Sequence, residues 1–369
     1  MKHRNQESGV RNRERRASTR GPSSKRAANV PARTLPAWKK LLFSAIVVLA
    51  VAGILEGGAR LFVHVAAASN GRWEFHRKII ESVGFPALEK ILIPEPVLFW
   101  ALRPNLDRVQ LAGRIAASSE VDFTVSTGAD GSRRMPAVGG ERQSVAFLGD
   151  SCTFGVGVND EQTFPALLQQ RLPWLRAIDL GVPGYTAYQG RLRLDDYPFP
   201  ATPAVVVITF GFNDEAVWDN RSDLEHAALL EAQRSWVNSS RFITLLAGLL
   251  SRPAPSTLEP GQTRRPRLSD EEFVAEIRRI VDWCRAWHAT PVLMLWPYRV
   301  QLARNDMSPK QRALLRLAAN DNLPLVNLIP FVRTLGGEGL FIDIIHASPA
   351  GHVVVAGALE PILRDVLAR

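Results

Sequence analysis

The stretch 144–157, which reads SVAFLGDSCTFGVG, decides how this chain is interpreted. Its first part, 145–148, is a short and continuous apolar run, which favours a strand buried on both faces. Gly149, Asp150 and Ser151 end this run at once, and further glycines follow, so we predict a tight loop before the next helix. Ser151 would then lie at the carboxyl end of a parallel strand, where open α/β sheets place their ligands.

Strand-like and helix-like patterns alternate along the rest of the chain. Strands are predicted at 144–148, 176–180, 204–209, 291–295 and 323–328. Helices are predicted at 161–172, 186–196, 222–250 with a break, 269–288, 308–319 and 349–368. This alternation is typical of a parallel sheet with helices on both faces. We therefore predict an α/β fold with a central five-stranded parallel sheet.

The positive charge of the chain is concentrated at its N-terminus. The formal net charge is +9, but residues 1–40 alone contain twelve Lys or Arg against two Glu, which leaves −1 for the remainder. A balanced main body lacks the clustered cations that nucleic-acid binding needs, so we expect no nucleic-acid partner. We expect the basic tail, 1–40, to be disordered and to contact anionic lipid headgroups.

An apolar segment follows this tail. Residues 41–63 include fifteen uncharged residues in a row and are long enough for a tilted transmembrane helix. Glu56 and Arg60 are four residues apart and can pair at the outer interface. The basic flank favours a cytoplasmic N-terminus, so we predict a single-pass signal anchor in the inner membrane, with the main domain periplasmic or extracellular. A signal peptide cleaved near 66–68 and a buried core helix are the alternatives.

Residues 64–140 are predicted to connect this helix to the main domain. Residues 97–102, after a turn at 94–96, read as a short strand that ends before a Pro104-Asn105 turn, and 121–125 alternates as a second strand before a Gly-rich turn. We expect a small β-rich layer packed on the main domain. A passive stalk is the alternative.

Later strand ends supply the groups that a reactive serine requires. Acyl transfer by serine needs a base, a carboxylate that orients the base, and donors for the oxyanion. Gly184 can bring a backbone N–H close to a substrate, and Asn213 offers a neutral side-chain amide. Asp343 and His346 are three residues apart, so each can hold the other's orientation while the imidazole points at Ser151. Each of these short motifs is common by itself, but their occurrence together in this order is a much more specific sign of a catalytic serine.

With these blocks the chain resembles the GDSL, or SGNH, hydrolase superfamily. The matching residues are Gly149-Asp150-Ser151, Gly184, Gly211-Phe212-Asn213-Asp214 and Asp343-Ile344-Ile345-His346. The resemblance covers residues 144–369 and implies a flavodoxin-like three-layer α/β/α fold. The upstream part is similar to membrane-anchored bacterial members of the superfamily.

The resemblance also implies the roles of the site residues. Ser151 would be the nucleophile, His346 the general base and then the acid, and Asp343 the residue that orients His346. The oxyanion hole would consist of the backbone N–H groups of Ser151 and Gly184 and the side chain of Asn213. One departure from the family is Asp179, where relatives often have Asn, and this puts a supporting hydrogen bond in question. Another is Cys152, where relatives usually have a larger apolar residue.

The sequence offers little for other chemistries. Its two cysteines, Cys152 and Cys284, do not form a disulfide scaffold and are expected to be small buried residues, although they could pair in an oxidising compartment. His346 and His352 lack the further ligands of a zinc site, and His352 is expected to pack locally. The 155–157 glycines lack the rest of a dinucleotide fingerprint. We predict no metal and no cofactor.

These observations divide the chain into four predicted parts: the tail 1–40, the signal anchor 41–63, the connecting segment 64–140 and the hydrolase domain 141–369. The predicted function is a serine esterase that hydrolyses an acyl or O-acetyl ester through an acyl-enzyme at Ser151. The alternatives are an O-acyltransferase acting on a cell-surface glycan and a non-catalytic binding module with the same fold. The expected partners are an ester or acylated glycan substrate and the membrane.

Overall fold

The computed structural model describes residues 36–67, 84–115, 119–137, 139, 142–218, 220–234, 240, 242–243, 246, 265–304 and 306–368. The chain divides into two compact units, Met1–Ile54 and Leu55–Arg369. Almost all of the predicted basic tail lies outside the described residues. The predicted boundaries after residues 40, 63 and 140 stay predictions.

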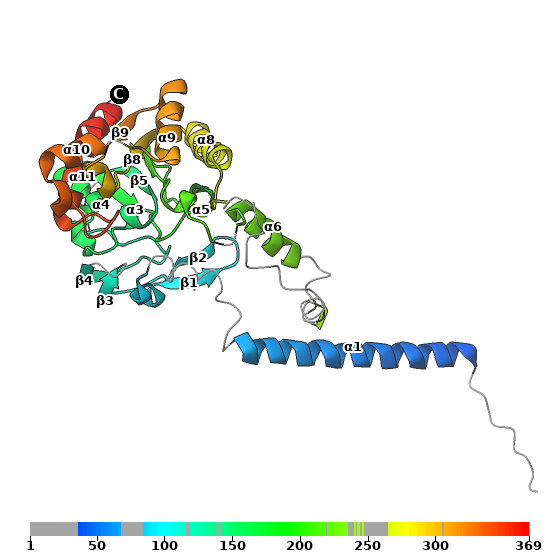
Figure 1. Cartoon of the computed structure of the whole chain (residues 1–369). Helices are drawn as coiled ribbons and strands as arrows, with labels where there is room; N and C mark the ends of the chain where they lie inside the picture. Colours follow the sequence, from blue (N-terminus) through cyan, green and yellow to red (C-terminus); the bar gives the residue numbers. More distant parts are fainter. Residues whose placement is uncertain are drawn as a thin grey trace, which may run out of the picture. The chain divides into compact units, whose positions relative to one another are not determined.

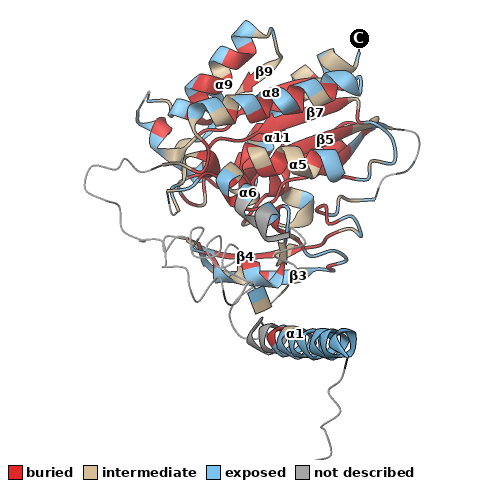
Figure 2. Cartoon of the chain, turned by 90° about the vertical axis from the view of Figure 1, so that its right-hand side faces the viewer, coloured by how far each residue is buried: buried red, intermediate tan, exposed pale blue. Residues whose placement is uncertain are grey.

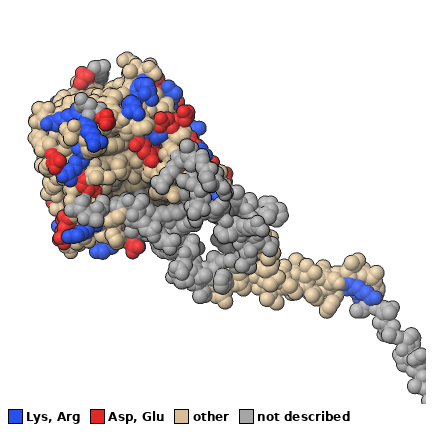
Figure 3. All heavy atoms as spheres, in the orientation of Figure 1, with Lys and Arg blue, Asp and Glu red and all other residues tan. Residues whose placement is uncertain are grey.

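Helix α1 (Ala37–Ala67) contains the predicted apolar segment and begins four residues before it. Its stretch Ala37–Leu61 has the length and composition of a membrane span, with a mean hydropathy of 2.2. Glu56 and Arg60 pair as predicted, with 2.7 Å between Oε1 and Nε. Figure 3 shows the helix surface as uncharged over most of its length, with basic side chains at one end. A signal sequence has the same properties, so the helix by itself gives only weak evidence of an anchor.

Five parallel strands form the central sheet, in the order β6-β5-β7-β8-β9 (Figure 1). Their bounds are Gln143–Gly149 for β5, Leu175–Asp179 for β6, Val205–Thr209 for β7, Thr290–Leu295 for β8 and Leu325–Asn327 for β9. Each corresponds to a predicted strand, so the predicted fold class is confirmed. The order is the flavodoxin-like 2-1-3-4-5, whose switch point lies between its first and third strands, here β5 and β7.

Helices cover both faces of this sheet and make the three predicted layers. Helices α4 (Phe164–Arg171) and α11 (Pro349–Leu367) pack together on one face. Helices α5 (Ala187–Asp196), α8 (Asp270–Ala286) and α9 (Pro309–Asn320) form the other layer. Alternate residues of β5 enter the two cores, Val145 and Phe147 on the α11 side and Ala146 and Leu148 on the α8 side. Figure 2 shows most of the central sheet as buried between these layers.

Several short elements were not predicted. These are helix α3 (Ser151–Phe154), helix α10 (Ile329–Leu335) and the 3-10 turns η1 (Pro86–Lys90), η2 (Asp160–Gln162), η3 (Asn213–Glu215), η4 (Arg299–Leu302) and η5 (Gly337–Leu340). Each is too short to show a helical period in the sequence. Helix α6 (Asp223–Arg234) matches the start of the predicted 222–250 helix, most of whose remainder lies outside the described residues.

The connecting segment forms two antiparallel hairpins. Strand β1 (Leu92–Glu95) pairs with β2 (Phe99–Leu102), and β3 (Val109–Ile115) pairs with β4 (Ser119–Val125). The turn predicted at 94–96 is therefore wrong in part, because β1 continues through Glu95. Leu111 and Phe123 belong to the same core as Leu148 of the central sheet. The segment thus packs on the main domain as predicted and is not a separate stalk.

Candidate active site

Ser151 lies directly after the first strand of the sheet, at the switch point of the topology. The predicted loop is in fact the one-turn helix α3, which Asp150 caps by accepting the N–H of Cys152 at 2.9 Å. The helix ends at Gly155, whose φ of +80° is left-handed and favours glycine. The sharp turn from strand to helix places the Ser151 hydroxyl at the carboxyl edge of the sheet.

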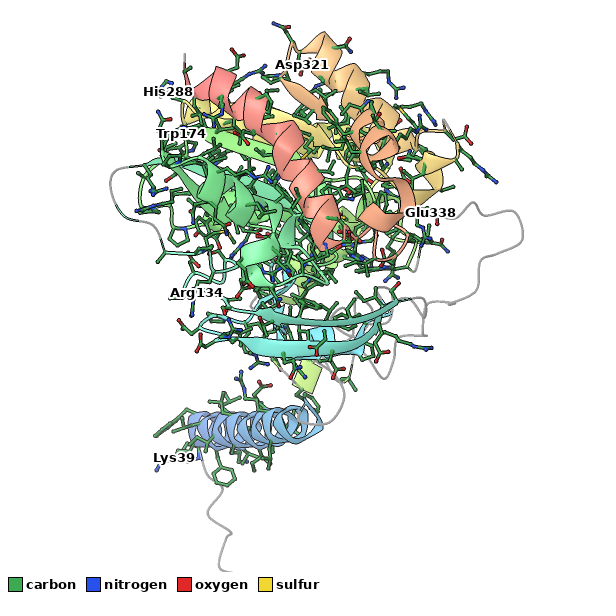
Figure 4. All side chains as sticks on the ribbon, turned by 90° about the vertical axis from the view of Figure 1, so that its left-hand side faces the viewer. Lys39, Arg134, Trp174, His288, Asp321 and Glu338 are labelled. Carbon is green, nitrogen blue, oxygen red and sulfur yellow. The ribbon has the colours of Figure 1, made fainter. Side chains whose placement is uncertain are left out.

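The segment that carries the predicted histidine reaches the same edge. Figure 4 labels three residues that stand just before strands of the sheet: Trp174 before β6, His288 before β8 and Asp321 before β9. All three lie at one end of the sheet. Glu338, from the turn that precedes Asp343, lies at the other end. The loop 341–347 is closed by an antiparallel bridge between Phe341 and Ala347. This bridge brings the Asp343 and His346 side chains back towards the end of β5.

The three predicted triad residues form one hydrogen-bonded chain. His346 Nε2 lies 2.8 Å from Ser151 Oγ, and His346 Nδ1 lies 2.7 Å from Asp343 Oδ2. The second carboxylate oxygen of Asp343 accepts the backbone N–H groups of Ile345 and His346, at 2.8 and 2.7 Å. All three side chains are nearly inaccessible to solvent. The structure thus brings together the three residues that the sequence proposes as a triad, and their catalytic roles stay predictions.

The charge state of Asp343 decides which nitrogen of His346 carries the proton. Burial by itself would raise the pKa of Asp343, but the hydrogen bond and charge of His346 and the two backbone N–H groups lower it below its ordinary value. Asp343 is therefore an ionised acceptor at neutral pH, and Nδ1 of His346 must carry the proton. In the neutral imidazole Nε2 is then free to accept the hydroxyl proton of Ser151.

The predicted oxyanion donors lie on adjacent loops. Val182 N–H donates to Gly149 O at 3.2 Å, so the loop that carries Gly184 lies beside the end of β5. Asn213 begins the η3 turn after β7, and its Nδ2 donates to Asp150 Oδ2 at 2.9 Å and to Tyr185 O at 3.2 Å. The backbone N–H groups of Ser151 and Gly184 donate to no protein acceptor among the described residues.

Two buried carboxylates support these loops, and the sequence reasoning did not assign them a role. Asp150 holds both the start of α3 and the Asn213 amide, and burial raises its pKa. Asp214 accepts the N–H groups of Ala187 and Gly211, each at 2.9 Å, and burial raises its pKa to about 7. Both residues stand inside the quoted motif blocks, but nothing in their spacing indicates which loop they hold.

The two cysteines and His352 are buried and have packing roles. Cys152 and Cys284 are both free and buried, and burial raises the pKa of the Cys152 thiol well above its usual range. Cys152 is therefore a poor nucleophile. His352 accepts the N–H of Phe164 at 3.1 Å and stacks on its ring, which confirms local packing. Within the described residues, no three His, Cys, Asp or Glu side chains gather as a metal-binding group.

A buried Ser–His–Asp chain at the switch point of a doubly wound sheet is the arrangement by which serine hydrolases activate their nucleophile. The sequence profile of the GDSL-like Lipase/Acylhydrolase family matches residues 147–354. The chain belongs to this family, which makes it a hydrolase of the ester-cleaving type. The matched region contains all four of the motif blocks.

Solved structures resemble the same part of the chain. A member of the lipolytic protein G-D-S-L family from Veillonella parvula is 12% identical, with a TM-score of 0.41, and the match covers 60% of this chain and 99% of that one. A lipase/acylhydrolase from Enterococcus faecalis is 16% identical, with a TM-score of 0.41 and coverages of 60% and 96%. An acetyl xylan esterase, AlAXEase, is 17% identical, with a TM-score of 0.41 and coverages of 60% and 99%. The curated proteins contain no match.

Proposed function

We propose that this protein is a membrane-anchored serine esterase that forms an acyl-enzyme at Ser151. The observation that carries the proposal is the continuous hydrogen-bonded chain from Asp343 through His346 to Ser151. Membership of an acylhydrolase family supports the same reaction class.

The first half of the reaction acylates the serine. Ser151 Oγ attacks the ester carbonyl carbon while His346 Nε2 takes the hydroxyl proton, and the carbonyl π electrons move to oxygen. Asp343 stabilises the imidazolium that forms, because its carboxylate stays ionised. When the tetrahedral intermediate collapses, the bond to the alkoxide breaks, and His346 passes its proton to that leaving group. The second half repeats these steps with water in place of serine and releases the acid.

The charge that develops on the carbonyl oxygen needs fixed donors. We assign the unpaired N–H groups of Ser151 and Gly184 to this role, together with Asn213 Nδ2. Of the two acceptors of Asn213, Asp150 is closer, so the substrate oxygen would replace the Tyr185 carbonyl as the second acceptor. Preorganised donors of this kind are commonly the largest single contribution to catalysis.

The test of this proposal compares two neighbouring substitutions in the full-length protein. Ser151→Ala should abolish labelling by a fluorophosphonate and lower ester turnover by roughly 10⁴ to 10⁶, because it removes the nucleophile. Cys152→Ala is the matched control, since the buried thiol takes no part in the reaction, and it should keep both labelling and turnover. Turnover of Ser151→Ala close to that of the wild type would disprove the proposal.

Product analysis separates hydrolysis from transfer. With an acylated donor and a glycan acceptor both present, an esterase releases the free acid, whereas an O-acyltransferase yields acylated glycan through the same acyl-enzyme. Acylated glycan as the main product would exclude the esterase assignment but leave the triad intact.

A further inference from the structure

The loop that carries Gly184 is a type II β-turn. Tyr185 N–H donates to Val182 O at 3.2 Å, which closes the turn, Pro183 occupies its second position, and Gly184 has a φ of +82° in the third. Type I and type II turns differ in the orientation of the central peptide, here the one that joins Pro183 to Gly184. Because this peptide is planar and trans, its C=O and its N–H point in opposite directions. The orientation of this one peptide therefore decides where the Gly184 N–H points.

The central peptide is held by a residue that lies about eighty positions earlier in the chain. Trp100 Nε1 donates to Pro183 O at 2.9 Å, from strand β2 of the first hairpin. In return, Tyr185 Oη donates to Trp100 O at 2.7 Å, and the two rings pack edge to face. Trp100 is fully buried, so this hydrogen bond is not exchanged with solvent. With Pro183 O fixed on the Trp100 side, the Gly184 N–H is directed to the opposite side of the turn.

The following peptide is held as well. Arg267 Nη1 donates to Gly184 O at 2.6 Å. Arg267 is itself buried and forms a bidentate ion pair with Asp223. Its Nε donates to Oδ1 at 3.0 Å and its Nη2 donates to Oδ2 at 2.7 Å. Both peptides that flank Gly184 thus have their carbonyls bound to buried donors, while the Gly184 N–H has no protein acceptor among the described residues.

We propose that Trp100 is a positioning residue of the active site: its indole N–H selects the type II turn and so aims the Gly184 N–H at the substrate oxyanion. This inference rests on the proposed esterase function. It gives the connecting segment a part in the chemistry, because that segment supplies the donor that orients a predicted oxyanion-hole group.

The experiment compares the same substitution at two neighbouring tryptophans in the full-length protein. Trp100→Phe removes the indole N–H that binds Pro183 O. Trp218→Phe is the matched control: its ring lies 5.7 Å from that of Trp100, but its buried Nε1 donates to no partner among the described residues. Active sites are counted by fluorophosphonate titration, and kcat and KM are measured with a p-nitrophenyl ester.

We expect Trp100→Phe to lower kcat about tenfold to a hundredfold with little change in KM, because an oxyanion donor acts only after attack. Inhibition by a trifluoromethyl ketone, which forms a tetrahedral oxyanion on the serine, should weaken by a similar factor. Trp218→Phe should change kcat and inhibition by less than about twofold, since it breaks no hydrogen bond and keeps an aromatic ring to stack on the Arg267 guanidinium, which lies 3.9 Å from the centre of the Trp218 ring.

Incorporating benzothienylalanine at position 100 provides a second variant should Trp100→Phe fail to fold. This analogue keeps the bicyclic ring but replaces the N–H with sulfur, so packing is retained and only the donor is lost. The inference is overturned if the analogue at position 100 has the kcat and inhibitor affinity of the wild type. The proposed function fails separately, if Ser151→Ala remains active.

Discussion

Asp179 illustrates how a single departure from the family pattern acts at the residue scale. It ends strand β6, and its Oδ1 accepts the N–H of Gly181 at 2.9 Å, a hydrogen bond that Asn could accept equally well. The other carboxylate oxygen is buried without a partner among the described residues. Burial raises the pKa of Asp179 to about 7, although Gly181 and the charge of Arg133 oppose the shift.

A raised carboxyl pKa makes the folded state bind more protons than the unfolded state between pH 4 and pH 7, so stability falls as pH rises through this window. We expect Asp179 to cost roughly 2 to 3 kcal/mol of unfolding free energy between pH 5 and pH 8. Asp179→Asn keeps the acceptor for Gly181 and removes the charge, so its advantage over the wild type should grow as pH rises.

Urea unfolding of both proteins at a series of pH values measures this difference. Asp214, whose pKa is also raised to about 7, is present in both proteins and cancels in the comparison. Parallel stability profiles for Asp179→Asn and the wild type would show that Asp179 is not the titrating group.

At the scale of elements, the connecting segment is an integral part of the catalytic unit. Arg133 follows the second hairpin and is fully buried. Its side chain donates to the carbonyls of Phe154, Gly155 and Val158 and pairs with Asp160 at 2.9 Å. One side chain therefore donates hydrogen bonds to several backbone carbonyls of the loop that follows helix α3. A residue that precedes the family match thus binds the loop next to Ser151.

Arg133→Ala should lower the unfolding free energy by about 3 to 5 kcal/mol, because it removes the cation that pairs with Asp160 and the donor for four backbone carbonyls, Thr124 O included. The neighbouring Arg134→Ala is the control: Arg134 pairs with Asp107 at 3.0 Å and donates to the carbonyls of Leu106 and Thr127 at 3.2 and 3.1 Å, but its side chain is exposed to solvent, so its loss should cost only about 1 to 2 kcal/mol. Thermal or urea unfolding of the two variants measures both effects. Equal losses of unfolding free energy in the two variants would mean that the buried Arg133 stabilises the fold no more than the exposed Arg134 does.

At the scale of the whole molecule, charge and hydropathy are segregated along the chain. The net charge resides in the N-terminal tail, and on the face seen in Figure 3 the catalytic body shows acidic and basic side chains interspersed. Helix α1 follows the tail with an uncharged run of membrane-spanning length. We propose that α1 is retained as a single-pass anchor, with the tail in the cytoplasm and the hydrolase on the other side of the membrane.

The anchor predicts that the full-length protein stays in the membrane pellet after an alkaline carbonate wash. Val48→Asp with Leu49→Asp should release it, since each charge at a helix centre costs about 3 kcal/mol of insertion. The control pair, Val48→Leu with Leu49→Ile, should stay in the pellet. A soluble wild-type chain that begins after residue 68 would instead identify α1 as a cleaved signal.

The sequence by itself determined the sheet, the order of its strands along the chain and the four motif blocks. These depend on local patterns: buried strands read as apolar runs, and catalytic groups follow strand ends. It did not indicate α3 and α10, whose four and seven residues are too few to show a helical period, nor the supporting roles of Asp150 and Asp214. It also could not connect Trp100 to Gly184 or Arg133 to the loop after Ser151. Those contacts join residues far apart in the chain, and only the packing of the hairpins against the sheet brings their donors and acceptors together.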